Sequence, residues 1–293
     1  MDFEIFRLNL RCLLRIAGAA MAVATPMLIP MQGSAAPIGK CGQLISLSGH
    51  EGSTLNYTLA GPSAGAKAAL VLLPGGGGYL NLDREGCPER LKGNSLVRKQ
   101  SLFHEKAFLT ALVDASSDYQ GNAGLAGFRI HKDHAEDIGK VIADLRKRTA
   151  LPVWLVGTSR GAISAANAAS RLSGVFAPNG LILTSPVTSG FEGGRKPWVA
   201  QTVFSNDLQA IRIPFLVVVH ADDMCIRTPP DLAPRVIGES GSPRGQSVAV
   251  SGGPGWSGGQ SVEACKGRSP HGFLDQEADV VAGIARFIGG QKY

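Results

Sequence analysis

Several patterns that mark metal or nucleotide sites are absent from this sequence. It has no C-x-x-C pair, which argues against a zinc ribbon or a thioredoxin-type site. It has no H-E-x-x-H helix, and the glycine run at 75–78 lacks the Lys-Ser or Lys-Thr of a phosphate-binding loop. His131, Asp133 and His134 are close in sequence, but nothing completes a metal site around them, so we interpret them as the start of a helix. We therefore expect no metal and no cofactor.

Aromatic residues are scarce, at 6% of the chain, and they are not interleaved with basic residues. A groove for nucleic acid combines both residue types, so nucleic acid is not an expected partner. The formal net charge is +6 and most charges are scattered along the chain, which indicates solubility rather than recognition of an acidic partner.

Only the N-terminus contains an apolar run that resembles an export or membrane segment. Three arginines accompany an apolar stretch over residues 16–31, and small residues follow at 33–36. This pattern predicts an export signal over residues 1–36, and therefore a secreted or periplasmic protein. An uncleaved membrane anchor is the alternative, although two prolines and the short apolar length disfavour it. We do not expect the mature chain to insert stably into a membrane.

Residues 37–293 have the length of one ordinary α/β domain, and no Pro/Ser-rich linker divides them. Cys12 would leave with the predicted signal. The mature chain then keeps four cysteines, Cys41, Cys87, Cys225 and Cys265. An even number of cysteines in an exported chain suggests two disulfides, for which three connectivities exist; free buried thiols are the alternative.

Hydrophobic patterning predicts strands that alternate with helices from residue 68 onward. Buried strands are expected at 68–73, 108–113, 151–157, 180–186 and 213–220, and a last, shorter strand at 246–251. Helices are expected at 95–106, 133–148, after residue 161 and at 276–288. Alternating residues at 42–49 and 53–61 predict a hairpin. The fold class is therefore α/β: a mostly parallel central sheet with helices on both faces, an antiparallel N-terminal hairpin and no large cap domain.

The stretch 151–171 carries the strongest functional signal. An apolar strand ends at Gly157 and a helical pattern follows Gly161, with Ser159 in the turn between them. This G-x-S-x-G spelling is that of a nucleophile elbow, in which the glycines leave room for a strained turn. A chain with 38 glycines can also spell this pattern by chance, but the strand and helix flanks favour a functional turn.

Two further candidates follow later strands. Asp222 and Asp223 come directly after the strand at 213–220, and His271 comes after the last strand. Active sites of open α/β sheets lie beyond the carboxyl ends of their strands, so these side chains are expected to meet Ser159 there. The order of nucleophile, acid and base along the chain is that of the α/β hydrolases. A surface histidine without a catalytic role is the alternative for His271.

The chain resembles the α/β-hydrolase superfamily over essentially its whole mature length. Four motifs in the right order carry the resemblance: PGGGG at 74–78, GTSRG at 157–161, HADDMC at 220–225 and SPHGF at 269–273. Within the superfamily the chain is similar to secreted bacterial serine hydrolases and esterases of undefined substrate. The resemblance implies cleavage of a carboxylic ester or related acyl bond through a Ser-His-Asp triad and a covalent acyl-enzyme.

Each motif then implies a role for its residues. Ser159 is expected to attack the acyl carbonyl and His271 to take its proton. Asp223 is favoured over Asp222 for orienting the imidazole, because the resemblance aligns the Asp-x-Cys spacing. The oxyanion is expected to bind the N–H of Arg160 and a second N–H from the glycine loop, that of Gly76 or Gly77.

The long loop over residues 252–270 would leave His271 poorly positioned unless something holds it. A Cys225–Cys265 bridge would join this loop to the acid loop, leaving Cys41 to pair with Cys87. The expected partner is a small acyl substrate, and the sequence leaves the oligomeric state open. The alternatives are a hydrolase-fold binding protein without turnover, or a peptidase or acyltransferase that uses the same triad.

Overall fold

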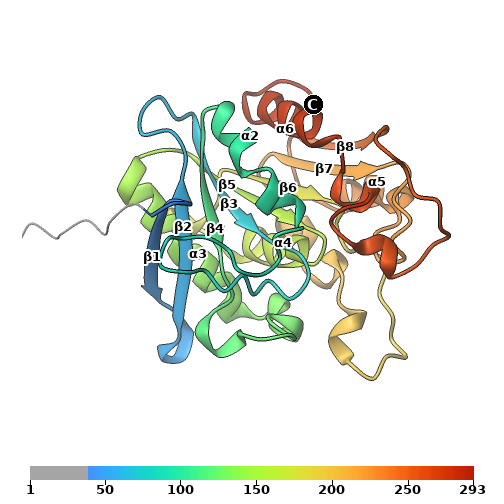
Figure 1. Cartoon of the computed structure of the whole chain (residues 1–293), viewed down its shortest axis with the longest axis horizontal. Helices are drawn as coiled ribbons and strands as arrows, with labels where there is room; N and C mark the ends of the chain where they lie inside the picture. The colour runs from blue at the N-terminus through green and yellow to red at the C-terminus, as the bar shows by residue number, and fades with distance from the viewer. Residues whose placement is uncertain (1–38) are drawn as a thin grey trace, which may run out of the picture. The chain divides into compact units, whose positions relative to one another are not determined.

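The computed structural model describes residues 39–293, so the export signal predicted over 1–36 lies outside the described residues. Eight strands form one sheet in the order β1-β2-β4-β3-β5-β6-β7-β8 (Figure 1). The strands are β1 Gln43–Ser48, β2 Thr54–Ala60, β3 Ala68–Leu73, β4 Phe108–Val113, β5 Val153–Thr158, β6 Gly180–Thr184, β7 Phe215–His220 and β8 Gly245–Val250. β2 pairs antiparallel with β1 and β4, and the remaining pairs are parallel.

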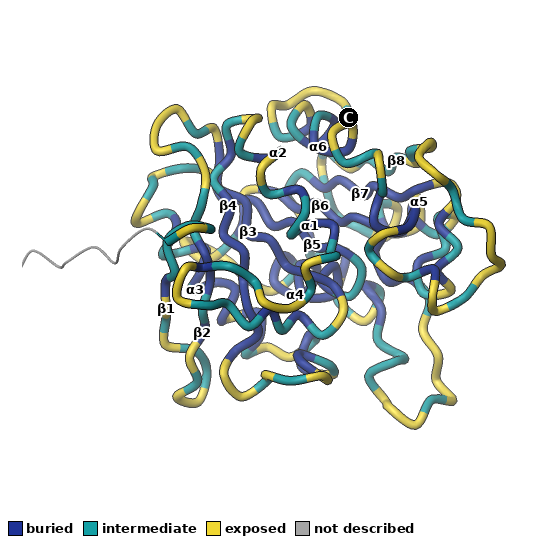
Figure 2. Tube along the Cα trace, in the orientation of Figure 1, coloured by how far each residue is buried: buried dark blue, intermediate teal, exposed yellow. Residues whose placement is uncertain are grey.

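Helices cover both faces of the sheet. The helices are α1 Ser95–Arg98, α2 Gln100–Glu105, α3 Lys132–Thr149, α4 Gly161–Arg171, α5 Ala233–Gly238 and α6 Glu277–Ile288, and short 3₁₀ turns lie between them. Side chains of α3, α4 and α5 share one apolar core, whereas those of α1, α2 and α6 share the other. Figure 2 shows the buried central strands between these layers.

The central strand β3 shows why the sheet must be covered on both sides. All six of its residues are apolar and buried. Ala69 and Val71 point into the core under α3 and α4, while Leu70 and Leu72 point into the core under α2 and α6. Alternate side chains of a strand face opposite sides, so a continuous apolar run suits a strand with two buried faces. The predicted α/β fold class is confirmed.

Two helices differ from the expectation. The helix expected over 95–106 is divided at Lys99 into α1 and α2. The short helix α5 was not expected. Its first turn contains Pro234, and proline is tolerated there because the N–H groups of a first turn have no partner within the helix. The connection from β6 to β7 contains only 3₁₀ turns and no large cap. No helix within residues 39–293 is long and apolar enough to cross a bilayer.

Lys99, at the junction of α1 and α2, is fully buried. Its Nζ has no hydrogen-bond partner in the described part of the chain and lies 4.5 Å from the centre of the Phe273 ring. Burial lowers the pKa of Lys99 to about 7, and the neighbouring Arg98 adds to this effect while Glu277 opposes it. The charged ammonium therefore opposes folding at and below neutral pH.

Replacing Lys99 by methionine should stabilise the protein most at pH 7 and below. In the wild type, the unfolded lysine keeps its proton up to about pH 10.5 but the folded one releases it near 7. Between these values wild-type stability should rise by about 1.4 kcal/mol per pH unit relative to Lys99→Met. Urea unfolding at several pH values measures the difference. The exposed Lys106→Met is the control, and equal pH slopes for wild type and Lys99→Met would refute the prediction.

Candidate active site

Ser159 lies in the sharp turn between β5 and α4, with a left-handed backbone φ of +52°. The turn requires its two glycines. A Cβ on Gly161 would lie 1.9 Å from the carbonyl oxygen of Leu73, and one on Gly157 would lie 2.6 Å from the carbonyl oxygen of Gly161. A side chain held in this strained region at the carboxyl end of a strand fits the geometry of a nucleophile elbow.

The glycine loop after β3 lies against this turn. A Cβ on Gly75 would lie 2.9 Å from the Cβ of Ser159, so a larger residue would displace one of the two backbones. Gly76 has a φ of +59° and, like Ser159, lines two cavities at this end of the sheet. Within residues 39–293, the N–H groups of Gly76 and Arg160 donate to no protein acceptor. Gly77 lies against residues 122–124 and lines neither cavity, so Gly76 is the better placed of the two candidates.

A buried arginine that the sequence did not reveal holds the glycine loop. Arg129 is 1% exposed, and its Nη2 donates to the carbonyl oxygens of Pro74 and Gly76, each at 3.2 Å. Its Nη1 donates to Ser164 Oγ at 2.8 Å. Burial holds the pKa of Arg129 well below its usual range, and the positive charge of Arg160 acts in the same direction. No sequence motif marks this residue, because its partners are mainly backbone oxygens.

Ser164, which accepts from Arg129, also contacts a buried histidine. His134 Nε2 lies 2.8 Å from Ser164 Oγ, and burial lowers the pKa of His134 to about 3, so it is neutral at physiological pH. A neutral imidazole adds no further positive charge beside Arg129. His134 therefore belongs to the support of the glycine loop, whereas His131 caps the start of α3. This agrees with the interpretation that these residues mark a helix start.

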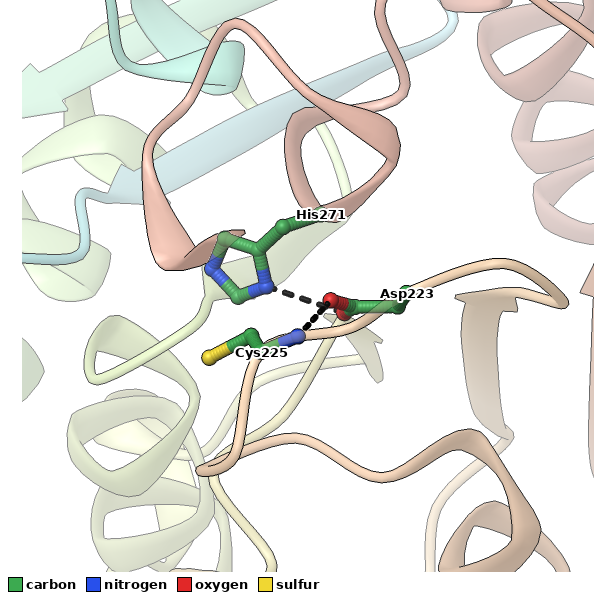
Figure 3. Close-up of side chains that lie close together, drawn as sticks. All are labelled: Asp223, Cys225 and His271. Carbon is green, nitrogen blue, oxygen red and sulfur yellow. Dashed lines mark hydrogen bonds and ion pairs between the residues drawn. The ribbon is translucent and has the colours of Figure 1, made fainter. Parts of the chain in front are cut away.

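The acid and base candidates form a buried pair. His271 Nδ1 lies 2.9 Å from Asp223 Oδ2, and both residues are at most 4% exposed (Figure 3). Asp223 also accepts from the N–H of Cys225 at 2.9 Å and from Thr228 Oγ1 at 2.8 Å. Asp222 is exposed, and its N–H donates to a histidine ring instead. The structure thus brings Asp223, and not Asp222, to His271.

A second arginine missed at the sequence level holds the loop of His271. Arg98 Nη1 donates to the carbonyl oxygen of Gly267 at 2.6 Å, and its Nη2 donates to that of Gly272 at 3.2 Å. The guanidinium also pairs with Glu277 at the start of α6. Ser185 Oγ donates to the carbonyl oxygen of His271 at 2.9 Å. These bonds fix the backbone on both sides of the imidazole.

The four cysteines within residues 39–293 form two disulfides, Cys41–Cys87 and Cys225–Cys265. The second bridge joins the loop of Asp223 to the loop that precedes His271. Ser261 adds a backbone bridge to Cys225 beside the disulfide. The acid and the base are therefore connected both through their own hydrogen bond and through the loops that carry them.

Asp223, Cys225 and His271 also place three potential metal-ligating atoms within 4.8 Å of one another. The three do not fit a metal. The sulfur of Cys225 is bonded in the disulfide and offers no thiolate, and the carboxylate and imidazole already bond each other.

Ser159 and His271 line the same cavity of about 280 Å³, at the carboxyl ends of β3 and β5. No hydrogen bond between the Ser159 hydroxyl and the His271 ring forms within residues 39–293. Hydrogen bonds of this kind are often longer in a free enzyme and tighten when the substrate binds. A second cavity, of about 320 Å³, is also lined by Ser159 and includes Trp198 in its wall.

The sheet order, the antiparallel β2 and the turn at Ser159 define an α/β-hydrolase fold, and solved structures agree. No protein-family model matches the sequence, and a search of curated proteins found no match. A cold-adapted esterase from an Arctic intertidal metagenome is 15% identical, with a TM-score of 0.54 over 83% of this chain and 92% of its own. A monoglyceride lipase variant from Saccharomyces cerevisiae is 12% identical, with a TM-score of 0.58 over 88% and 99%. A lidless α/β serine hydrolase from Xanthomonas campestris is 16% identical, with a TM-score of 0.51 over 82% and 95%.

Removing the Cys225–Cys265 bridge should loosen the loop of His271 specifically. Each disulfide closes a loop of similar size, with sequence separations of 46 for Cys41–Cys87 and 40 for Cys225–Cys265, so serine pairs at either bridge should cost about 4 kcal/mol of stability. Hydrogen exchange across residues 261–272 should rise only in Cys225→Ser/Cys265→Ser. The matched control is Cys41→Ser/Cys87→Ser, and equal exchange in the two variants would contradict the role assigned to the bridge.

Proposed function

We propose that the protein is a serine hydrolase that cleaves a carboxylic ester or a related acyl bond. The observation that carries the proposal is the buried pair of Asp223 and His271 beside the cavity that the strained Ser159 lines. A hydroxyl is a poor nucleophile until a base removes its proton, and an imidazole held by a carboxylate is suited to that task. The esterase and lipase structures with the same fold support this class of reaction.

The proposed reaction starts with attack of Ser159 Oγ on the acyl carbonyl, while His271 Nε2 takes the hydroxyl proton. Asp223 holds Nδ1 and stabilises the imidazolium that forms. The N–H groups of Arg160 and Gly76 bind the oxyanion of the tetrahedral intermediate. His271 then gives the proton to the leaving alcohol, and the acyl group stays on Ser159. A water molecule, deprotonated by His271, releases the acid and restores the hydroxyl.

We further propose that residues 1–36 are an export signal and that 37–293 are the mature domain of a secreted or periplasmic enzyme. The two disulfides support this location, since such bridges persist in oxidising compartments. The connection between β6 and β7 carries no large cap, which favours soluble or surface-displayed esters over a lipid interface.

A binding protein without turnover is the second candidate, and the observation that favours it is the missing hydrogen bond between Ser159 and His271. The two candidates differ in the reactivity of the hydroxyl. An activated serine reacts with a fluorophosphonate, whereas an ordinary serine does not.

A fluorophosphonate probe should label the purified protein covalently at Ser159. Ser159→Ala should remove the labelling and reduce ester hydrolysis by about a thousandfold or more, because it removes the nucleophile. Intact-protein mass spectrometry and peptide mapping measure the label. Ser101→Ala, which changes an exposed serine of α2, is the control and should label like the wild type. A folded wild type that stays unlabelled would favour the binding protein.

Exchanging the two neighbouring acids for their amides should have unequal effects. Asp223→Asn should lower kcat about a thousandfold or more, because an amide stabilises the wrong tautomer of His271 and does not balance its charge. Asp222→Asn changes an exposed side chain and should alter kcat by about twofold or less. Steady-state kinetics on a neutral ester compares them. A larger loss in Asp222→Asn would show that the acid is assigned to the wrong residue.

A further inference from the structure

The two cavities beside Ser159 differ in their linings. The cavity of about 280 Å³ includes His271 in its wall, whereas the cavity of about 320 Å³ does not. Under the proposed function, the leaving oxygen must receive its proton from His271 and therefore leaves through the first cavity. The acyl group then occupies the second cavity. This assignment rests on the proposed function.

Two arginines line the second cavity together with apolar side chains. The Arg160 guanidinium lies over the ring of Trp198, with 4.0 Å from its central carbon to the ring centre. The Nη2 of Arg227 donates to the carbonyl oxygen of Val199. The aromatic ring and the carbonyl hold the two planar groups in place without removing their charge.

Neither arginine has an acidic partner among the described residues. The salt bridges of residues 39–293 include neither guanidinium, and no Asp or Glu lines the cavity. The other polar side chains of the lining, those of Ser159, Trp198 and Gln201, are uncharged. The amide oxygen of Gln201 is buried without a hydrogen-bond partner in the described part of the chain.

The lack of an acidic partner and the burial of the site affect the pKa values of both arginines. Burial lowers the pKa of Arg160 to about 10, and the positive charge of Arg227 contributes in the same direction. Burial also lowers the pKa of Arg227. Two partly desolvated, like charges thus face one small cavity, and an anion placed there would offset both the lost hydration and the repulsion.

We propose that this cavity binds an acyl group that ends in a carboxylate, so that the substrates are half-esters of short dicarboxylic acids. A guanidinium offers paired N–H donors that match the two oxygens of a carboxylate. Val187, Val199 and Val262 supply apolar wall for the methylene groups between the carboxylate and the scissile carbonyl. The volume of about 320 Å³ has room for a short chain together with its carboxylate.

The test compares two ethyl esters with acyl chains of equal length, monoethyl glutarate and ethyl pentanoate, by ethanol release. The wild type should show a kcat/KM for monoethyl glutarate about tenfold or more above that for ethyl pentanoate, as expected for charge-assisted hydrogen bonds. Arg227→Gln should lower this ratio about tenfold, and Arg227→Lys should retain part of it. The preference should also weaken as salt is added.

Arg195→Gln is the matched control, since it removes one exposed positive charge from the β6–β7 connection, which also carries Trp198, without lining the cavity. Its ratio should equal that of the wild type. Circular dichroism and melting temperature show whether each variant folds. Fluorophosphonate labelling of Ser159 without faster cleavage of monoethyl glutarate overturns this inference alone, as does an unchanged ratio in folded Arg227→Gln. An unlabelled protein that cleaves neither ester overturns the proposed function and this inference with it.

Discussion

The close packing of backbone around residue 159 is the constraint on which the candidate site depends. Gly161 sits so near Leu73 that a single added carbon would overlap its carbonyl oxygen. A Cβ on Gly75 would also come within 2.9 Å of the side chain of Ser159. The strands β3 and β5 are neighbours in the sheet, so their carboxyl ends bring the glycine loop against the strained turn. The strain is maintained because the buried β5 and α4 on either side fix where the turn begins and ends.

Two arginines, whose hydrogen-bond partners are mainly backbone carbonyl oxygens, hold the loops that complete the site. Arg129 binds the glycine loop, and Arg98 binds the backbone around His271. Both act on segments far away in the sequence, and the Cys225–Cys265 bridge adds a covalent connection. Long loops lose much conformational freedom when they become ordered, so several anchors are needed to place a base reliably. Arg160 and Arg227 differ, because both line a cavity beside Ser159.

The sequence predicted the parts of this protein that depend on local pattern. Continuous apolar runs indicated the buried strands, and the strand ends located Ser159, Asp223 and His271. The resemblance to α/β hydrolases further separated Asp223 from its neighbour. The division of a helix at Lys99 was missed because no Gly or Pro marks it. The arginine anchors were missed because a bond to a distant carbonyl leaves no pattern in the chain. Ser159 and His271 line one cavity, as the strand ends predicted, but no hydrogen bond joins them in the described part of the chain.

In the proposed reaction, Ser159, His271 and two backbone N–H groups act on one reacting centre. A crystal structure of the protein after reaction with a fluorophosphonate tests this most directly. We predict phosphorus bonded to Ser159 Oγ, with the phosphoryl oxygen about 2.7–3.1 Å from the N–H nitrogens of Gly76 and Arg160. His271 Nε2 should lie within hydrogen-bond distance of an oxygen on the phosphorus. An adduct on another residue, or an imidazole turned away from the phosphorus, would contradict the account.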